Sequence, residues 1–182
     1  TKQLQEIVLT VKRGFSSYYF RKEGIKSSFI NIGDIKDGRV DASTVTTIHV
    51  KDTGALDKAR IEPNDIVISI KGSTFKAAIA DKTIKDFVIS ANLIAFKLND
   101  EVLPEIVVAY LNSSKGQSEL IARSAGAVQK ALNLKSLMGI TIPIPEKKKQ
   151  IIISEYLAIF KEYNSLFERE QRIRKNINKK II

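Results

Sequence analysis

The 182-residue sequence contains no cysteine and no tryptophan, and it has one histidine and one methionine. Without cysteine, disulfide bonds and thiolate metal sites are excluded, and a reducing compartment is compatible with the composition. The apolar runs fall well short of the roughly 18 residues that a membrane-spanning helix needs. A chain of this length suits one domain with an ordinary apolar core plus an appendage, and we expect no membrane segment.

Sequence motifs of several enzyme classes are also missing. There is no Gly-x-x-x-x-Gly-Lys-Ser/Thr phosphate loop, no Gly-x-Gly-x-x-Gly and no His-Glu-x-x-His. The Asn/Asp-Pro-Pro-Tyr/Phe signature of adenine methyltransferases is absent, and no Asp…Glu-x-Lys nuclease trio stands out. His49 lies in a β-branched run typical of a strand, and Asp34 and Asp37 are interpreted as turn carboxylates. We therefore predict no catalytic residue and no metal site.

Charge is the first positive feature, because 30 Lys and Arg face 20 Asp and Glu, which gives a net charge of +10 and a pI near 9.7. Such a balance favours nucleic acid or another anionic surface as a partner. A lysine-rich protein without such a partner has the same composition, so charge alone leaves the two readings open.

The last 37 residues, from Glu146 to Ile182, contain no Gly and no Pro. Their apolar residues are spaced alternately four and three apart, which is the heptad pattern of a helix that packs along another helix. Only Glu170 interrupts the series. At ~1.5 Å per residue such a helix is about 55 Å long, which exceeds a compact domain and argues against an ordinary amphipathic helix folded back on it. We predict a helix–helix interface made by Ile152, Tyr156, Ile159, Tyr163, Leu166, Ile173 and Ile177.

The part before this tail is rich in short apolar and β-branched runs separated by turn signals, which predicts a β-rich domain. Asp37-Gly38 and the segment Glu62–Asp65 are expected to be turns. The segment Lys12–Glu23, with aromatic residues between basic ones, is expected to be a loop. Strands are expected near 28–32, 44–50, 66–70, 77–80, 87–89, 93–98 and 140–144, a helical turn or linker at 57–60, helices at 103–111 and 115–123, and a short turn at 134–138.

An ordered series of motifs then resembles the specificity subunits of type I restriction–modification systems. The series runs from Pro63–Ser69 through Ala91–Ile94, Leu103-Pro104-Glu105 and Ala125–Lys130 to Ile142-Pro143-Ile144-Pro145 with Lys149-Gln150. The chain resembles one target-recognition domain followed by one of the family's long spacer helices. Two positions depart from the pattern: Glu146–Lys149 lacks the usual Leu, and Phe75 stands where a second Gly is common.

Such subunits usually carry two recognition domains and two helices, whereas this chain carries one of each. The resemblance therefore implies a half-subunit or a fragment, and a homodimer with antiparallel helices would restore the two-fold arrangement. It also implies that S-adenosylmethionine, ATP and Mg are held by partner subunits and that this chain holds no cofactor. The implied partners are double-stranded DNA, methyltransferase subunits and restriction subunits, in the cytoplasm of a bacterium or archaeon.

Donor-rich loops supply the candidate contacts to DNA. Lys and Arg bind phosphates, while Arg, Gln, Ser and Thr can also read base edges in the major groove. Tyr18 and Tyr19 can pack on a sugar or stack on a displaced base, although a solvated basic turn explains the same residues. Gln129 is interpreted as a brace for its turn. The candidates are Lys12, Arg13, Ser17, Tyr18, Tyr19, Arg21, Lys22, Lys71, Ser73, Thr74, Lys76, Arg123 and Lys130.

These observations together predict an α+β protein. Residues 1–145 form a β-rich DNA target-recognition domain with small helices, and residues 146–182 form a long dimerisation and spacer helix. The predicted function is sequence-specific, non-catalytic recognition of one half of a bipartite DNA site. A coiled-coil adaptor or regulator that does not read DNA sequence is the alternative, and a nuclease with an unrecognised metal site is a second one.

Overall fold

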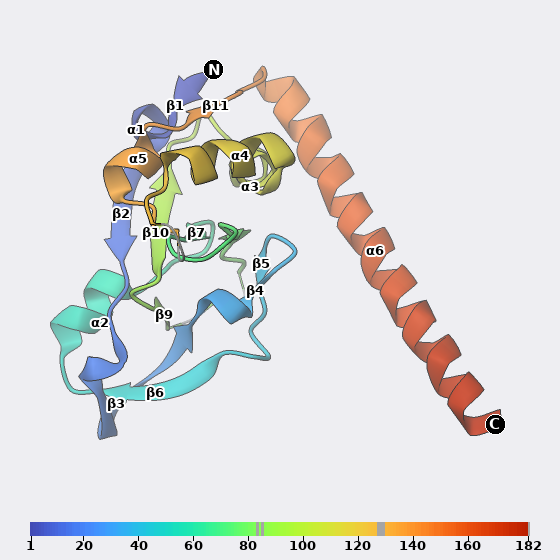
Figure 1. Cartoon of the computed structure of the whole chain (residues 1–182), viewed down its shortest axis with the longest axis horizontal. Helices are drawn as coiled ribbons and strands as arrows, with labels where there is room; N and C mark the ends of the chain where they lie inside the picture. The colour runs from blue at the N-terminus through green and yellow to red at the C-terminus, as the bar shows by residue number, and fades with distance from the viewer. Residues whose placement is uncertain (83, 85, 127–129, 182) are drawn as a thin grey trace.

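The computed structural model describes residues 1–82, 84, 86–126 and 130–181, with side chains through Ile177. It forms a β-rich head, defined here as residues 1–145, from which one long helix departs (Figure 1). The predicted α+β class is confirmed.

The centre of the head is a six-stranded sheet in the order β2-β10-β7-β8-β5-β4. Strand β10 runs antiparallel to both β2 and β7, and β8 is antiparallel to β7 but parallel to β5. The bounds are β2 Val8–Arg13, β4 Ile35–Lys36, β5 Arg39–Val40, β7 Ile66–Ser69, β8 Ala77–Ile79 and β10 Leu93–Leu98.

A second sheet and a short strand pair complete the β structure. The second sheet has the order β6-β3-β9, with β3 Phe20–Ile30, β6 Thr46–Val50 and β9 Phe87–Ile89. Helix α2 (Thr53–Ala59) lies beside it, with the Asp52 carboxylate accepting from the Ala55 N–H at its start. Strand β1 (Lys2–Gln3) pairs with β11 (Thr141–Ile142), so the first residues of the chain lie beside the segment that leads into the long helix (Figure 1).

Two apolar cores lie on opposite faces of the central sheet, because side chains alternate along a strand. Ile66 and Ile68 of β7 enter the core under the helices α1 (Leu4–Ile7), α3 (Pro104–Asn112), α4 (Ser114–Arg123) and α5 (Leu134–Met138). Val67 enters the other core, which β3, β6, β9 and α2 cover. Since both faces are covered, every residue of β7 is buried.

The turns behave as their residues predict. Asp37 and Gly38 join β4 to β5 with φ of 48° and 72°, and Asn64 in the turn before β7 has φ of 70°. Asn, Asp and Gly are the residues that tolerate this left-handed region. The expected helical turn at 57–60 is the end of the longer α2.

The expectation of a continuous loop over Lys12–Glu23 is wrong. Strand β2 extends to Arg13 and β3 already begins at Phe20, so only a short segment with a 3-10 turn at Ser17–Tyr19 (η1) lies between them. The cause is aromatic packing, because Phe20 lies edge-on to Phe29 with ring centroids 4.8 Å apart. A register shift between Phe20 and Ile25 keeps both opposite Val50 and gives β3 its unexpected length.

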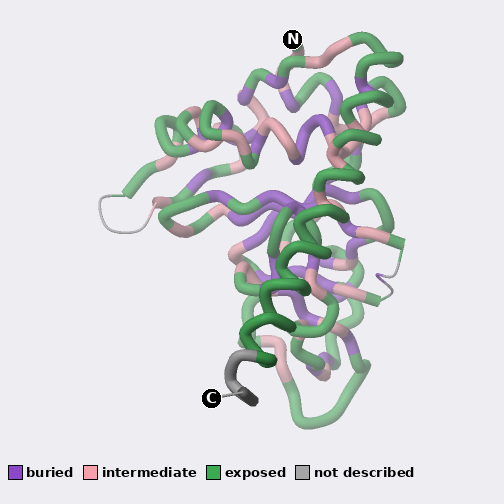
Figure 2. The backbone as a smooth tube through the Cα atoms, turned by 90° about the vertical axis from the view of Figure 1, so that its right-hand side faces the viewer, coloured by how far each residue is buried: buried purple, intermediate pink, exposed green. Residues whose placement is uncertain are grey.

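Helix α6 (Lys147–Ile181) confirms the predicted long tail. It begins beside the β1–β11 pair and runs past α3, its main neighbour in the head, before extending away (Figure 1). Most of its described length is exposed, as the tube coloured by burial shows (Figure 2). No described helix is both long and apolar enough to span a membrane.

Candidate nucleic-acid interface

The strand register brings several predicted contact residues to one end of the central sheet. Arg13 at the end of β2 pairs with Ile94 near the start of β10, and Ile94 pairs with Ile68 near the end of β7. Both β2 and β7 run antiparallel to β10, so the segment after β2 and the loop after β7 leave the sheet at the same end. Two segments more than 50 positions apart in the chain therefore leave the same end of the sheet, with β10 between their strands.

An aromatic loop, residues 14–20, lies at this end of the sheet. Phe15 is buried against the rings of Tyr19, Phe20 and Phe29 at 5.6–6.4 Å. Gly14 is required beneath it, since a Cβ there would lie 2.0 Å from the Ser90 carbonyl oxygen. The loop is therefore fixed from inside, with its outer residues free to contact a partner.

Tyr18 is the outermost aromatic residue, with 78% of its surface exposed. Its ring stands edge-on to Tyr19 at 5.7 Å, and the Arg21 guanidinium lies 6.0 Å from the ring centroid. Arg21 also donates to the carbonyl oxygens of Tyr18 and Phe20 at 2.8 and 2.7 Å. Ser17 and Lys22 are exposed nearby in sequence. A large exposed ring held by a cation is suited to packing against a sugar or a base.

The β7–β8 loop, residues 70–76, lies at the same end of the sheet. The Gly72 N–H donates to the Lys130 carbonyl oxygen at 3.1 Å, and the Leu132 N–H donates to the Ile70 carbonyl oxygen at 2.9 Å. Lys71, Ser73 and Thr74 are exposed on the loop. The segment before α5 thus braces a loop that offers an ammonium group and two hydroxyls. The interpretation of Gln129 as a brace lies outside the described residues.

Three predicted contact residues have polar partners within the chain. The Lys12 ammonium lies 3.1 Å from the fully buried carboxylate of Asp65 and 3.4 Å from Glu62. Arg123 pairs with Glu119 one turn earlier on α4 at 3.1 Å. Lys76 donates to the Ile35 carbonyl oxygen at 3.4 Å. Lys12 is thus bonded to a buried carboxylate, whereas Lys76 and Arg123 remain exposed beside their partners and stay candidate contacts.

The predicted helix–helix interface lies on the side of α6 that faces away from the head. The only residues of α6 at least partly buried among those described are Gln150, Ser154, Leu157 and Lys161, here called the head-facing stripe. At about 100° per residue, this stripe lies on the opposite side of α6 from the seven residues of the predicted interface, here called the seam. The seam side chains are 50–68% exposed. The helix thus contacts its own head on one side and leaves the seam free for another helix.

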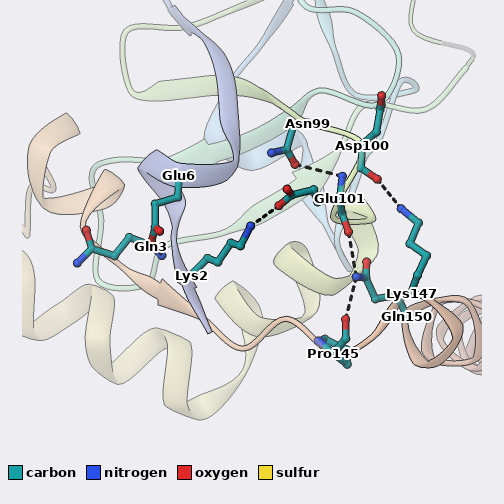
Figure 3. Close-up of polar contacts among 9 residues, drawn as sticks. All are labelled: Lys2, Gln3, Glu6, Asn99, Asp100, Glu101, Pro145, Lys147 and Gln150. Carbon is teal, nitrogen blue, oxygen red and sulfur yellow. Dashed lines mark hydrogen bonds and ion pairs between the residues drawn. The ribbon is translucent and has the colours of Figure 1, made fainter.

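Gln150, in the first turn of α6, fixes this orientation. The sequence pattern indicated this residue only as part of a family motif, and the structure gives it a clear role. Gln150 is 2% exposed and accepts from the Leu103 N–H at 2.9 Å. Its amide donates to the carbonyl oxygens of Glu101 and Pro145 at 3.0 and 2.9 Å. Lys147 adds a bond to the Asp100 carbonyl oxygen at 2.6 Å, and Lys2 pairs with Glu101 (Figure 3). These contacts join the first turn of α6 to the segment between β10 and α3.

A cleft of about 510 Å³ lies between α6 and the head, lined by the β4–β5 turn, α3, Leu157 and Lys161. Burial lowers the pKa of Lys161, and the Arg39 guanidinium lowers it further, while Glu105 and Asp37 oppose the shift. Within the described residues, no group of three or more His, Asp or Glu side chains is arranged to hold a metal ion.

Comparison with known proteins identifies the fold. The model of the type I restriction modification DNA specificity domain matches residues 1–179. The type I restriction enzyme EcoBI specificity subunit of Escherichia coli is 28% identical over 160 residues, which cover 86% of this chain and 31% of that protein.

Solved structures agree. A chain from a type I R-M system superposes with a TM-score of 0.66 at 22% identity, over 93% of this chain and 40% of that one. The HsdS subunit from Thermoanaerobacter tengcongensis gives 0.64 at 19% identity, over 93% and 39%. The type I S subunit from M. genitalium gives 0.60 at 20% identity, over 88% and 38%.

The chain spans about a third of the curated relative and about 40% of each solved subunit. The resemblance found in the sequence is confirmed, and the chain belongs to the family of type I restriction–modification DNA specificity domains.

Proposed function

We propose that this chain recognises one half of a bipartite DNA target as a non-catalytic specificity subunit, or part of one. The observation that carries the proposal is the convergence of the aromatic loop and the β7–β8 loop at one end of the central sheet. Exposed Tyr18 and Lys71 lie on these two loops, and exposed Arg13 ends β2 directly before the first of them. Fixed loops with cationic, hydroxyl and aromatic groups suit phosphate contact together with base reading.

The helix α6 has the second role in this proposal. Its seam faces away from the head and pairs with the seam of a second copy, so that two heads face two half-sites. Methyltransferase subunits, and restriction subunits with them, dock on the assembled chains and hold S-adenosylmethionine, ATP and Mg. The pure chain should therefore leave plasmid DNA intact in the presence of Mg²⁺, and Mg²⁺-dependent cleavage would identify it as a nuclease instead.

DNA recognition is tested by incubating the full chain with a pool of random double-stranded DNA and sequencing the bound fraction. A defined motif should be enriched over successive rounds. The adaptor alternative predicts binding without sequence preference that weakens steeply between roughly 50 and 200 mM salt. That outcome would contradict the recognition role.

Homodimerisation is tested by light scattering on the wild type and on Ile159→Glu. The substitution places a charge in the seam, so a dimer should become a monomer. Ser165→Glu adds the same charge outside the seam and should remain dimeric. A monomeric wild type would show that the seam pairs with a different helix.

A further inference from the structure

Strand β8 lacks a neighbouring strand on one edge where the β7–β8 loop enters it. Within the described residues, β5 pairs with β8 only at Ile79, through Arg39. Lys76 exchanges bonds with Ser69 on the β7 side, so the backbone groups of Phe75 and Ala77 point to the opposite edge. Buried backbone groups at such an edge need other partners.

Two side-chain amides supply those partners. Asn112, at the end of α3, accepts from the Ala77 N–H at 3.0 Å and donates to the Ala77 carbonyl oxygen at 2.8 Å. Gln117 of α4 accepts from the Phe75 N–H at 3.0 Å and donates to the Phe75 carbonyl oxygen at 2.7 Å. The two amides thus replace a missing strand, residue by residue.

The Gln117 amide also joins the two helices, since it donates to the Leu111 carbonyl oxygen at 2.7 Å. Phe75, the residue it holds, is fully buried. The backbone just before it carries Ser73 and Thr74, whose side chains are exposed. Any change in the position of Phe75 therefore moves the exposed part of the loop.

We propose that Gln117 and Asn112 are positioning residues for DNA recognition, which fix the backbone of the β7–β8 loop so that Lys71, Ser73 and Thr74 meet DNA in one geometry. The inference rests on the proposed function. Both amides lie behind the loop, so they act on specificity without contacting DNA. Contacts that read bases depend on position more strongly than contacts with phosphates, which carry no sequence information.

The test compares the full-length wild type with Gln117→Leu, Gln117→Glu and Asn112→Leu. Gln117→Glu keeps an acceptor for the Phe75 N–H but loses the donor and places a negative charge beside the Phe75 and Leu111 carbonyl oxygens. Asn112→Leu serves if neither Gln117 variant folds. Asp52→Ala is the control, because it removes a helix-capping bond of α2 that does not contact the loop. The probes are the duplex enriched from the random pool and a scrambled duplex of equal length.

The expected result is that the amide variants lose about ten-fold in affinity for the enriched duplex and little for the scrambled one. Amide hydrogen exchange should also accelerate at Phe75 and Ala77. The Asp52→Ala control should lower thermal stability without changing the affinity ratio of the two duplexes. That ratio separates positioning from general stability, since a loss of folded protein reduces both affinities equally.

An unchanged affinity ratio in the folded amide variants would overturn the inference. If Lys71→Ala still weakens binding to the enriched duplex in that case, the proposed function stands without it. If the wild type enriches no sequence from the random pool, both the proposed function and this inference are overturned. That result is known before any variant is measured.

Discussion

Gln150 shows how one side chain can set the direction of a helix. Its amide makes three hydrogen bonds to backbone groups of residues 101, 103 and 145. All three lie at the junction, so the first turn of α6 is held to the head mainly by hydrogen bonds between one side chain and the backbone. The direction of the 35-residue helix therefore depends on its first turn.

Substitution of Gln150 by Leu leaves one backbone N–H and two carbonyl oxygens without these partners in a buried site. We expect the free energy of unfolding to fall by about 3 kcal/mol, since unsatisfied buried polar groups are costly. Chemical denaturation measures the change. Lys148→Ala, an exposed substitution on the same turn, is the control and should have little effect; a Gln150 variant as stable as this control would show that the bonds contribute nothing.

Tyr18 offers a second test at this scale. Because its ring is largely exposed, Tyr18→Ala should leave stability nearly unchanged but lower affinity for the enriched duplex by about ten-fold. Fluorescence anisotropy measures the affinity. Leu9→Ala removes another exposed apolar side chain from β2, away from the loop, and should bind DNA normally. Equal affinities for both variants would remove Tyr18 from the interface.

Residue types alone predicted which side chains can contact DNA, but not the partners that those side chains have within the chain. Lys12, Lys76 and Arg123 are chemically suitable, yet the first two bond to Asp65 and Ile35, 53 and 41 positions away. The partners of Gln117 and Asn112 are 42 and 35 positions away. No short-range pattern reveals such pairs, because the fold alone brings them together.

At the scale of elements, α3 and α4 are packed more closely than any side chain at position 116 allows. A Cβ on Gly116 would lie 2.0 Å from the Tyr110 carbonyl oxygen. We expect Gly116→Ala to force the helices apart and to lower the free energy of unfolding by about 1 to 3 kcal/mol.

The matched control for this substitution is Gly33→Ala, since a Cβ there meets no atom within 4 Å. Thermal unfolding of both variants measures the difference. Similar melting temperatures for the two would show that α3 and α4 can separate without cost.

The β4–β5 turn region should respond to acid. The Lys36 ammonium, followed by the Ser43 hydroxyl, lowers the pKa of Asp41 to about 2. The ordinary value is near 4, so the unfolded chain takes up the proton first. The stabilisation by the carboxylate is therefore present above about pH 4 and is lost as the pH falls towards 2.

We expect Asp41→Asn to be less stable than wild type at neutral pH and equally stable near pH 2. Melting temperatures measured across this range test the expectation. Lys36→Met removes the largest cause of the shift and should give a smaller difference of the same sign, because the Ser43 hydrogen bonds to Asp41 remain. A difference that stays constant with pH would exclude the carboxylate as its source.

Most elements followed from period-two alternation, turn residues and the heptad spacing of the tail. The first half of β3 did not, because it is exposed and is held by the aromatic cluster and by pairing with β6. The order of the strands also could not be derived, since β3–β9 and β5–β8 pair in parallel across long connections. The convergence of the two loops depends on that order.

At the scale of the whole molecule, a dimer through α6 predicts avidity. A duplex with two inverted copies of the enriched half-site, at the right spacing, should bind about a hundred-fold more tightly than a duplex with one copy. Titration of the two duplexes measures the gain. Ile159→Glu should abolish it while leaving single-site affinity intact, whereas a gain that persists in this variant would locate the dimer contact elsewhere.

The outward direction of the seam has a consequence for the unpaired chain. Beyond Lys161, the described side chains of α6 are all exposed, so this stretch has no tertiary packing within one copy. Most helical stability in proteins comes from the packing of an apolar face, so this stretch is only weakly stable by itself. Ordering of the distal tail and association should then be one thermodynamic event, with a negative heat-capacity change larger than rigid docking would give. A solitary chain would carry a frayed end open to proteases, and a paired one would be protected.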